Sequence, residues 1–178
     1  NHRKLRQSFD MIINKTYYLS PSEKEVVRTI GRMRQTNKLN TGWNGSGHQF
    51  SDDAELGHII GFAGEFIFCR EQNLSADFTI SNTSKRLGND KYDCKMGGAY
   101  IDVKTGARHR PLMQWKDNPI RDEIALPYFI CKTYQDWTEL IFKGYSTGAI
   151  LCQEKYLVVG KDGKDSYSQP TSELMDEE

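Results

Sequence analysis

The stretch Lys91-Tyr-Asp-Cys-Lys-Met-Gly-Gly-Ala-Tyr-Ile-Asp-Val-Lys104 predicts a β-hairpin. Gly97-Gly98 separates two runs of alternating character, and two glycines suit a two-residue hairpin turn because both can adopt positive φ. Counting outward from this turn predicts which residues pair. One face holds Met96 with Ala99, Cys94 with Ile101 and Tyr92 with Val103. The other face holds Lys95 with Tyr100, Asp93 with Asp102 and Lys91 with Lys104. Because side chains alternate along a strand, one face is apolar or aromatic and the other is charged.

The charged face places two carboxylates opposite each other. Directly opposed residues have Cβ atoms roughly 4.5–5.5 Å apart, and like charges there are destabilising. Asp93 against Asp102 is therefore a poor arrangement for a plain surface but a good one for holding a divalent cation through oxygen ligands. Lys104 lies on the same face, where an ammonium can contact a phosphate or orient a water. The alternative is a one-sided hairpin with a solvated, charged face.

The order Asp93, then Asp102-Val103-Lys104, resembles the core signature of the PD-(D/E)XK nuclease superfamily. In that family the motif lies on a hairpin, and an upstream helix usually adds an acidic residue. Glu65, within Gly61-Phe-Ala-Gly-Glu-Phe-Ile-Phe68, stands in the matching place. Tyr92 replaces the proline that often precedes the first aspartate. The resemblance covers residues 53 to 153 approximately and leaves the first fifty unexplained.

The resemblance implies a catalytic set and a metal. Glu65, Asp93, Asp102 and Lys104 would be the catalytic residues. Mg²⁺ or Mn²⁺ would be bound by Glu65, Asp93 and Asp102, with the carbonyl of Val103 as an additional ligand. Hard oxygen ligands suit either ion, and such an ion can act as Lewis acid, water activator and template in phosphodiester hydrolysis. Lys104 would position the water or offset charge in the transition state.

The same resemblance implies an α/β fold of the restriction-endonuclease-like class, a central mixed sheet flanked by helices, here with an extra N-terminal helix. With 178 residues and 37% hydrophobic content, one nuclease-like domain over 1–178 is expected. We divide it into a basic lead-in (1–19), an N-terminal helix (20–39), a core (53–160) and an acidic tail (161–178). The helix has clear start signals, since Ser20 can cap it, Pro21 suits its first position and Glu23 completes a capping box.

Local patterns predict the remaining elements. A loop over 40–52 precedes a helix over 53–72 that is apolar around nearly its whole circumference, which makes Glu65 an anomalous buried carboxylate. His58, on the same helix, reads as a hydrogen-bonded core residue. Further predicted elements are strands at 77–80, 112–115, 128–134, 138–145 and 156–159, a polar link at 81–90, a short helix at 147–154 and a frayed tail from 161.

Charge and cysteine usage indicate the partners and the compartment. Arg108, Arg110 and Lys116 belong to a basic segment without clear periodicity, and we expect them to contact nucleic acid. No run is long and apolar enough for a membrane span and no secretory pattern is visible, so no membrane partner is expected. The four cysteines lack C-x-x-C spacing, which favours reduced thiols in the cytoplasm, or in the host cytoplasm if the source is a phage or virus.

We therefore expect a metal-dependent nuclease that hydrolyses phosphodiester bonds, acting on DNA in preference to RNA. Its small size resembles phage-type Holliday junction resolvases and stand-alone structure-directed nucleases, and a homodimer is compatible with this. One alternative is a catalytically silent nucleic-acid-binding module on the same fold. The other is a viral RNA endonuclease, because cap-snatching enzymes place a histidine on the site helix, as His58 would be.

Overall fold

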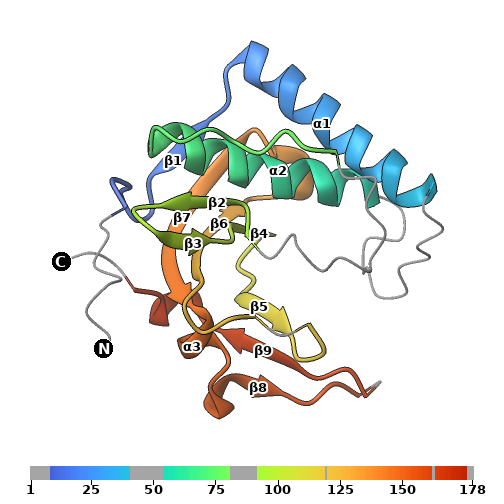
Figure 1. The fold of residues 1–178 in the computed structure, drawn as a ribbon. Coiled ribbons are helices and arrows are strands. Elements are labelled where there is room, and N and C mark those ends of the chain that lie inside the picture. Colours follow the sequence, from blue (N-terminus) through green and yellow to red (C-terminus); the bar gives the residue numbers. More distant parts are fainter. Residues whose placement is uncertain (1–8, 41–53, 81–91, 119, 162, 176–178) are drawn as a thin grey trace.

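The structure is a computed structural model, and it describes residues 9–40, 54–80, 92–118, 120–161 and 163–175 (Figure 1). These residues form an α/β fold around a six-stranded mixed sheet. Two long helices lie on one side of this sheet, and a three-stranded sheet lies on the other (Figure 1). The α/β class expected from the sequence is confirmed at this level.

The central sheet has the order β1-β7-β6-β3-β2, and β4 also pairs with β6. Its strands are β1 (Thr16–Tyr18), β2 (Cys94–Met96), β3 (Ala99–Ile101), β4 (Lys104–Ala107), β6 (Ala125–Cys131) and β7 (Glu139–Thr147). Strand β6 runs parallel to β3 and β4 and antiparallel to β7. All seven residues of β6 are buried, as expected for a strand covered on both faces.

The hairpin has the predicted register. Met96 pairs with Ala99, Lys95 with Tyr100 and Cys94 with Ile101. Gly97 and Gly98 form the turn with φ of 52° and 89°. Both positions need positive φ, which is the conformation that makes consecutive glycines favourable there.

Two helices cover one face of the central sheet. Helix α1 (Pro21–Asn40) begins with the predicted capping box, in which the Ser20 amide donates to Glu23 Oε2 at 2.6 Å and the Glu23 amide donates to Ser20 Oγ at 3.4 Å. Helix α2 (Ala54–Glu71) lies between α1 and the sheet. A Cβ at Gly64 would overlap Thr105 Oγ1, so the glycine lets α2 approach β4 closely. Gly61, by contrast, has open space where a Cβ would lie.

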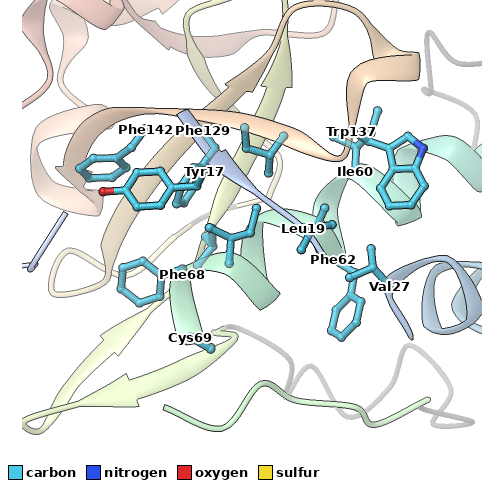
Figure 2. Packing of buried hydrophobic residues seen from close by; sticks show 14 of the residues in the cluster. Tyr17, Leu19, Val27, Ile60, Phe62, Phe68, Cys69, Phe129, Trp137 and Phe142 are labelled. Atoms are coloured by element: carbon cyan, nitrogen blue, oxygen red, sulfur yellow. The ribbon is translucent and has the colours of Figure 1, made fainter. Parts of the chain in front are cut away.

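The main core lies between α2 and the sheet, and aromatic and aliphatic side chains fill it together (Figure 2). Phe62 and Phe68 of α2 are fully buried, as is Phe129 of β6. Three of the four cysteines, Cys69, Cys94 and Cys131, are buried free thiols, as predicted.

We expected residues 1–19 to be a basic lead-in outside a core that begins at residue 53. From Phe9 onward this expectation is wrong. Phe9, Met11, Tyr17 and Leu19 are buried in the main core. Strand β1 pairs antiparallel with β7. The segment is short and its partner is distant in sequence, so its local pattern gave no strand signal.

The second sheet consists of β5 (Leu112–Trp115), β9 (Ser166–Gln169) and β8 (Leu157–Val158) in the order β5-β9-β8. Strand β5 is the predicted strand at 112–115. The predicted frayed tail is wrong over 166–175, because Ser166 and Gln169 are buried and β9 pairs with both β5 and β8. The predicted helix at 147–154 is shorter in the structure, where α3 covers Gly148–Leu151. The described residues also contain three short 3-10 helices, η2 (Tyr134–Asp136), η3 (Glu154–Tyr156) and η4 (Thr171–Glu173).

Residues 77–80 do not form the predicted strand. Backbone groups of this segment form hydrogen bonds with side chains instead of with another strand. Arg34 Nη2 donates to the Asp77 carbonyl at 2.9 Å, and the Thr79 amide donates to Asp77 Oδ1 at 2.8 Å. The predicted loop over 40–52, apart from Asn40 at the end of α1, and the predicted link over 81–90 lie outside the described residues, as does Lys91. No helix in the described ranges combines the length and apolar character that crossing a membrane would need.

Candidate functional site

The candidate site residues come from α2 and from the chain beyond the end of the β2–β3 ladder, and this hairpin lies beneath α2 in Figure 1. The last ladder pair is Cys94 with Ile101, and the predicted pairs of Asp93 with Asp102 and of Tyr92 with Val103 do not form. Instead the Val103 amide donates to Asp93 Oδ2 at 2.6 Å. The carboxylate of Asp93 is thus turned inward and replaces a main-chain acceptor.

The Asp93 carboxyl is in an environment that disfavours its charge. Burial is the largest cause and holds its pKa well above the usual value. The negative charges of Glu65 and Asp102 raise it further, while the Val103 amide and the Lys104 charge oppose the rise. A carboxylate shifted by burial and by neighbouring carboxylates is typical of functional sites.

Glu65 projects from α2, and its partner comes from α1. Arg34 Nη1 lies 3.0 Å and 2.9 Å from the two Glu65 carboxylate oxygens. The guanidinium also lies over the Phe62 ring at 4.6 Å, and both charged side chains are largely shielded from solvent. Burial raises the pKa of Glu65; Arg34 opposes this, and the charge of Asp102 adds to it.

Asp102 and Lys104 form an ion pair at the point where β3 passes into β4. Lys104 Nζ lies 2.7 Å from Asp102 Oδ2. The Asp102 amide donates to the Ala125 carbonyl at 2.9 Å, which ties this residue to β6. The predicted neighbourhood of Asp102 and Lys104 is therefore present, with the lysine in direct contact with the aspartate.

The carboxylate cluster, as we call it below, consists of Glu65, Asp93 and Asp102. The charge of Asp102 acts on both Glu65 and Asp93, and the charge of Glu65 acts on Asp93. Their donor chemistry fits Mg²⁺ or Mn²⁺, since all are oxygen ligands and a cation would relieve their repulsion. In the arrangement observed, each carboxylate already contacts a protein donor: Arg34, the Val103 amide or Lys104. Within the described ranges, no three acidic, histidine or cysteine side chains converge closely enough to hold a metal ion.

Arg34 is a site residue that sequence reasoning missed. It lies 31 positions before Glu65 and on a different helix. The buried glutamate was itself the only signal that a cationic partner had to exist. His58, from the same helix as Glu65, is half-buried.

The three predicted nucleic-acid contacts are not gathered at the carboxylate cluster. Arg108 and Arg110 are exposed and follow the far end of β4, and Arg110 lies over the Tyr134 ring at 5.8 Å. Lys116 follows β5 in the second sheet, where it forms an ion pair with Asp165 at 3.3 Å. No protein-family model, curated protein or solved structure matches this chain.

Proposed function

We propose that this protein is a metal-dependent nuclease of the PD-(D/E)XK type, acting on DNA in preference to RNA. One observation carries the proposal. The negative charge of Asp102 raises the pKa of both Glu65 and Asp93, and Glu65 also raises that of Asp93. Lys104 Nζ lies 2.7 Å from Asp102 Oδ2. Partly buried carboxylates that repel one another are typical of functional sites, so a functional use is favoured. A restriction-endonuclease-like arrangement is consistent with α2 packed on a mixed sheet and the motif on a hairpin at the sheet edge.

The proposed roles follow from position. Asp93, Asp102 and Glu65 would hold Mg²⁺ or Mn²⁺, with the Val103 carbonyl as a further ligand. The bound ion would supply Lewis acidity and lower the cost of activating water. Lys104 carries a fixed positive charge beside Asp102, where it would stabilise the negative charge that develops on the phosphate oxygens. Asp93, held by the Val103 amide, keeps one carboxylate oxygen in a fixed position.

The experiment is incubation of the purified protein with single-stranded, double-stranded and branched DNA and with RNA, in Mg²⁺, in Mn²⁺ and in EDTA. We expect cleavage with either metal and none in EDTA. The matched control is the Asp102→Asn protein, which keeps the size of the side chain and loses the charge. Robust cleavage in EDTA, or by the control, contradicts the proposal.

A second candidate is a catalytically silent nucleic-acid-binding module. The observation that favours it is the engagement of all three carboxylates by protein donors, with Arg34 already neutralising Glu65. This candidate predicts binding of nucleic acid without cleavage in any metal. It also predicts that Mn²⁺ leaves the melting temperature unchanged.

A further inference from the structure

We propose that Tyr92, Lys95 and Tyr100 form a binding site for an unpaired nucleobase of the strand on which the carboxylate cluster acts. This inference rests on the proposed function, since it assigns a substrate subsite next to that site. The three residues, called the tyrosine platform below, belong to the β2–β3 hairpin and the residue run leading into it. They take no part in the carboxylate cluster.

The tyrosine platform is a compact aromatic surface with a cation on it. The ring centroids of Tyr92 and Tyr100 are 4.6 Å apart with planes inclined at 51°. Lys95 Nζ lies 4.7 Å from the centroid of Tyr100 and 5.3 Å from that of Tyr92. Both distances fall within the range of a cation–π contact.

One ring of the platform is anchored and the other is open to solvent. Tyr100 packs against the second buried cluster, the one that contains Leu126 and Tyr128. Tyr92 is 37% exposed, and Lys95 is exposed as well. The anchored ring fixes the position of the pair, so a ligand that stacks on the open ring does not have to order the surface first.

The register places Lys95 and Tyr100 near the two aspartates of the carboxylate cluster along the strands. Lys95 is paired with Tyr100, and both lie two positions from an aspartate of the cluster, Asp93 on one strand and Asp102 on the other. At about 3.3 Å of rise per residue, the separation along the strands is roughly 7 Å. That distance is within the reach of a few nucleotides of a single strand. A strand with a phosphate at the cluster therefore has a base within reach of the platform.

The chemistry selects an unpaired base on a polyanionic chain. Aromatic side chains stack on the π-face of any base, which gives sequence-tolerant binding of single strands. In a duplex the neighbouring base pairs cover those faces. Lys95 supplies positive charge for a flanking phosphate, which offsets the negative field of the carboxylate cluster. The ligand is thus a single-stranded region, a frayed end or a branch point.

The test measures binding without cleavage. Single-stranded oligonucleotides that contain the fluorescent adenine analogue 2-aminopurine, and duplexes of the same sequence, are titrated with protein in EDTA. Stacking on the platform should quench the fluorescence of the single strand. Tyr92→Leu should weaken single-strand binding by about five- to a hundredfold, the range typical of losing one base–aromatic stack, and should abolish the quench. Duplex affinity should change less than twofold.

Three further variants make the result specific. Tyr92→Phe keeps the ring and should retain wild-type affinity and quench. Tyr18→Leu, at an exposed tyrosine on β1 at the opposite edge of the central sheet, should change neither. Lys95→Gln should reduce the slope of log affinity against log salt by about 0.7, as expected for one lost phosphate contact on a single strand.

The outcomes separate this inference from the proposed function. Binding that depends on Tyr92 without any metal-dependent cleavage supports the platform and removes the nuclease proposal. Cleavage by wild-type protein together with unchanged single-strand binding by Tyr92→Leu overturns the platform and leaves the nuclease proposal standing. Wild-type protein that binds single strands in EDTA no more tightly than Tyr92→Leu also overturns it.

Discussion

Two groups of buried polar residues in this protein are built in opposite ways. The first joins the two sheets: Ser146 Oγ of β7 donates to Gln169 Oε1 of β9 at 2.6 Å, and Gln169 Nε2 donates to the Glu173 carbonyl at 2.8 Å. Ser146 and Gln169 are fully buried. The hydroxyl, side-chain amide and carbonyl groups of this neutral network are all uncharged. Each has a hydrogen-bond partner, as buried polar groups in stable proteins normally do.

The carboxylate cluster differs in both respects. It brings together three carboxylates, and burial and mutual repulsion raise the pKa values of Glu65 and Asp93. Its partners, Arg34 and Lys104, are charged side chains from α1 and β4. The two groups therefore point to different roles: a satisfied neutral network helps to specify a fold, whereas buried carboxylates with raised pKa values are typical of functional sites.

The largest expected effect is on catalysis at the charged cluster. Lys104→Ala should lower the rate of nucleic-acid cleavage by about 10²–10³-fold, because a positioned charge acts mainly on the transition state. Affinity for nucleic acid, measured in EDTA, should stay within about threefold of the wild type. Lys132→Ala removes an exposed lysine after β6 and serves as the control. A Lys104→Ala protein that cleaves at nearly the wild-type rate would place this lysine outside the reaction.

The next effect tests the neutral network as a purely structural device. Gln169→Leu leaves the Ser146 hydroxyl and the Glu173 carbonyl without their buried partner, and should lower the free energy of unfolding by about 3 kcal/mol. Urea denaturation measures this. Cleavage per folded molecule should not change. Gln135→Leu, at an exposed position, should be near neutral in both assays. Loss of cleavage in the folded Gln169→Leu protein would erase the distinction between the two groups.

A third change removes the partner of Glu65. Arg34→Gln should lower the free energy of unfolding by about 2 kcal/mol at pH 7, since a largely buried carboxylate loses its counter-ion. Without Arg34 the pKa of Glu65 rises further, and protonation removes the unpaired charge. The deficit should therefore shrink as pH falls through that raised pKa, as urea denaturation across a pH series would reveal.

The exposed ion pair between Arg32 and Glu55 is the matched control, at a similar distance of 2.8 Å but open to solvent. Arg32→Gln should change the free energy of unfolding by less than about 0.5 kcal/mol at any pH. Equal deficits for the two variants would mean that Arg34 is an ordinary surface residue.

The smallest expected effect is an increase, not a decrease, in the free energy of unfolding. Asp93→Asn should raise the free energy of unfolding of the metal-free protein by about 1 kcal/mol at pH 7, because the amide oxygen still accepts from the Val103 amide while the repulsive charge is gone. The folded pKa of Asp93 is raised, so the wild-type protein loses stability as pH rises through it. The advantage of the variant should thus vanish under acidic conditions.

Mn²⁺ adds a second readout at the same position. At a hundred times its dissociation constant, Mn²⁺ should stabilise the wild type by about 2.7 kcal/mol, and Asp93→Asn should lose most of this gain. Differential scanning calorimetry of both proteins in EDTA and in Mn²⁺ measures both quantities. A variant that is less stable without metal, or that keeps the full response to Mn²⁺, contradicts the role of Asp93 as a ligand.

The sequence predicts those parts of the molecule that depend on local signals. The hairpin register follows from Gly97-Gly98 and strict alternation, and the start of α1 follows from Ser20 and Glu23. The juxtaposition of Asp102 and Lys104 is likewise local, because the two residues are only two positions apart in the chain.

The parts that were missed depend on contacts between distant segments. Arg34 reaches Glu65 only because α1 packs on α2, and nothing within either helix specifies that contact. Strand β9 is polar and short, and it becomes a strand only between β5 and β8. Asp93 turns toward the Val103 amide at the point where the ladder stops, and a register count cannot foresee that point.

The pairing of β1 with β7 has a consequence for the synthesis of the chain. Thr16 lies opposite Ile141, so the two partners are 141 − 16 = 125 residues apart. At roughly 5–20 residues per second, a ribosome needs about 6–25 seconds to add them. During that interval Phe9, Met11 and Leu19 have no sheet to pack against. The nascent chain therefore presents this apolar segment to chaperones, or to other unfinished copies, until β7 has been made.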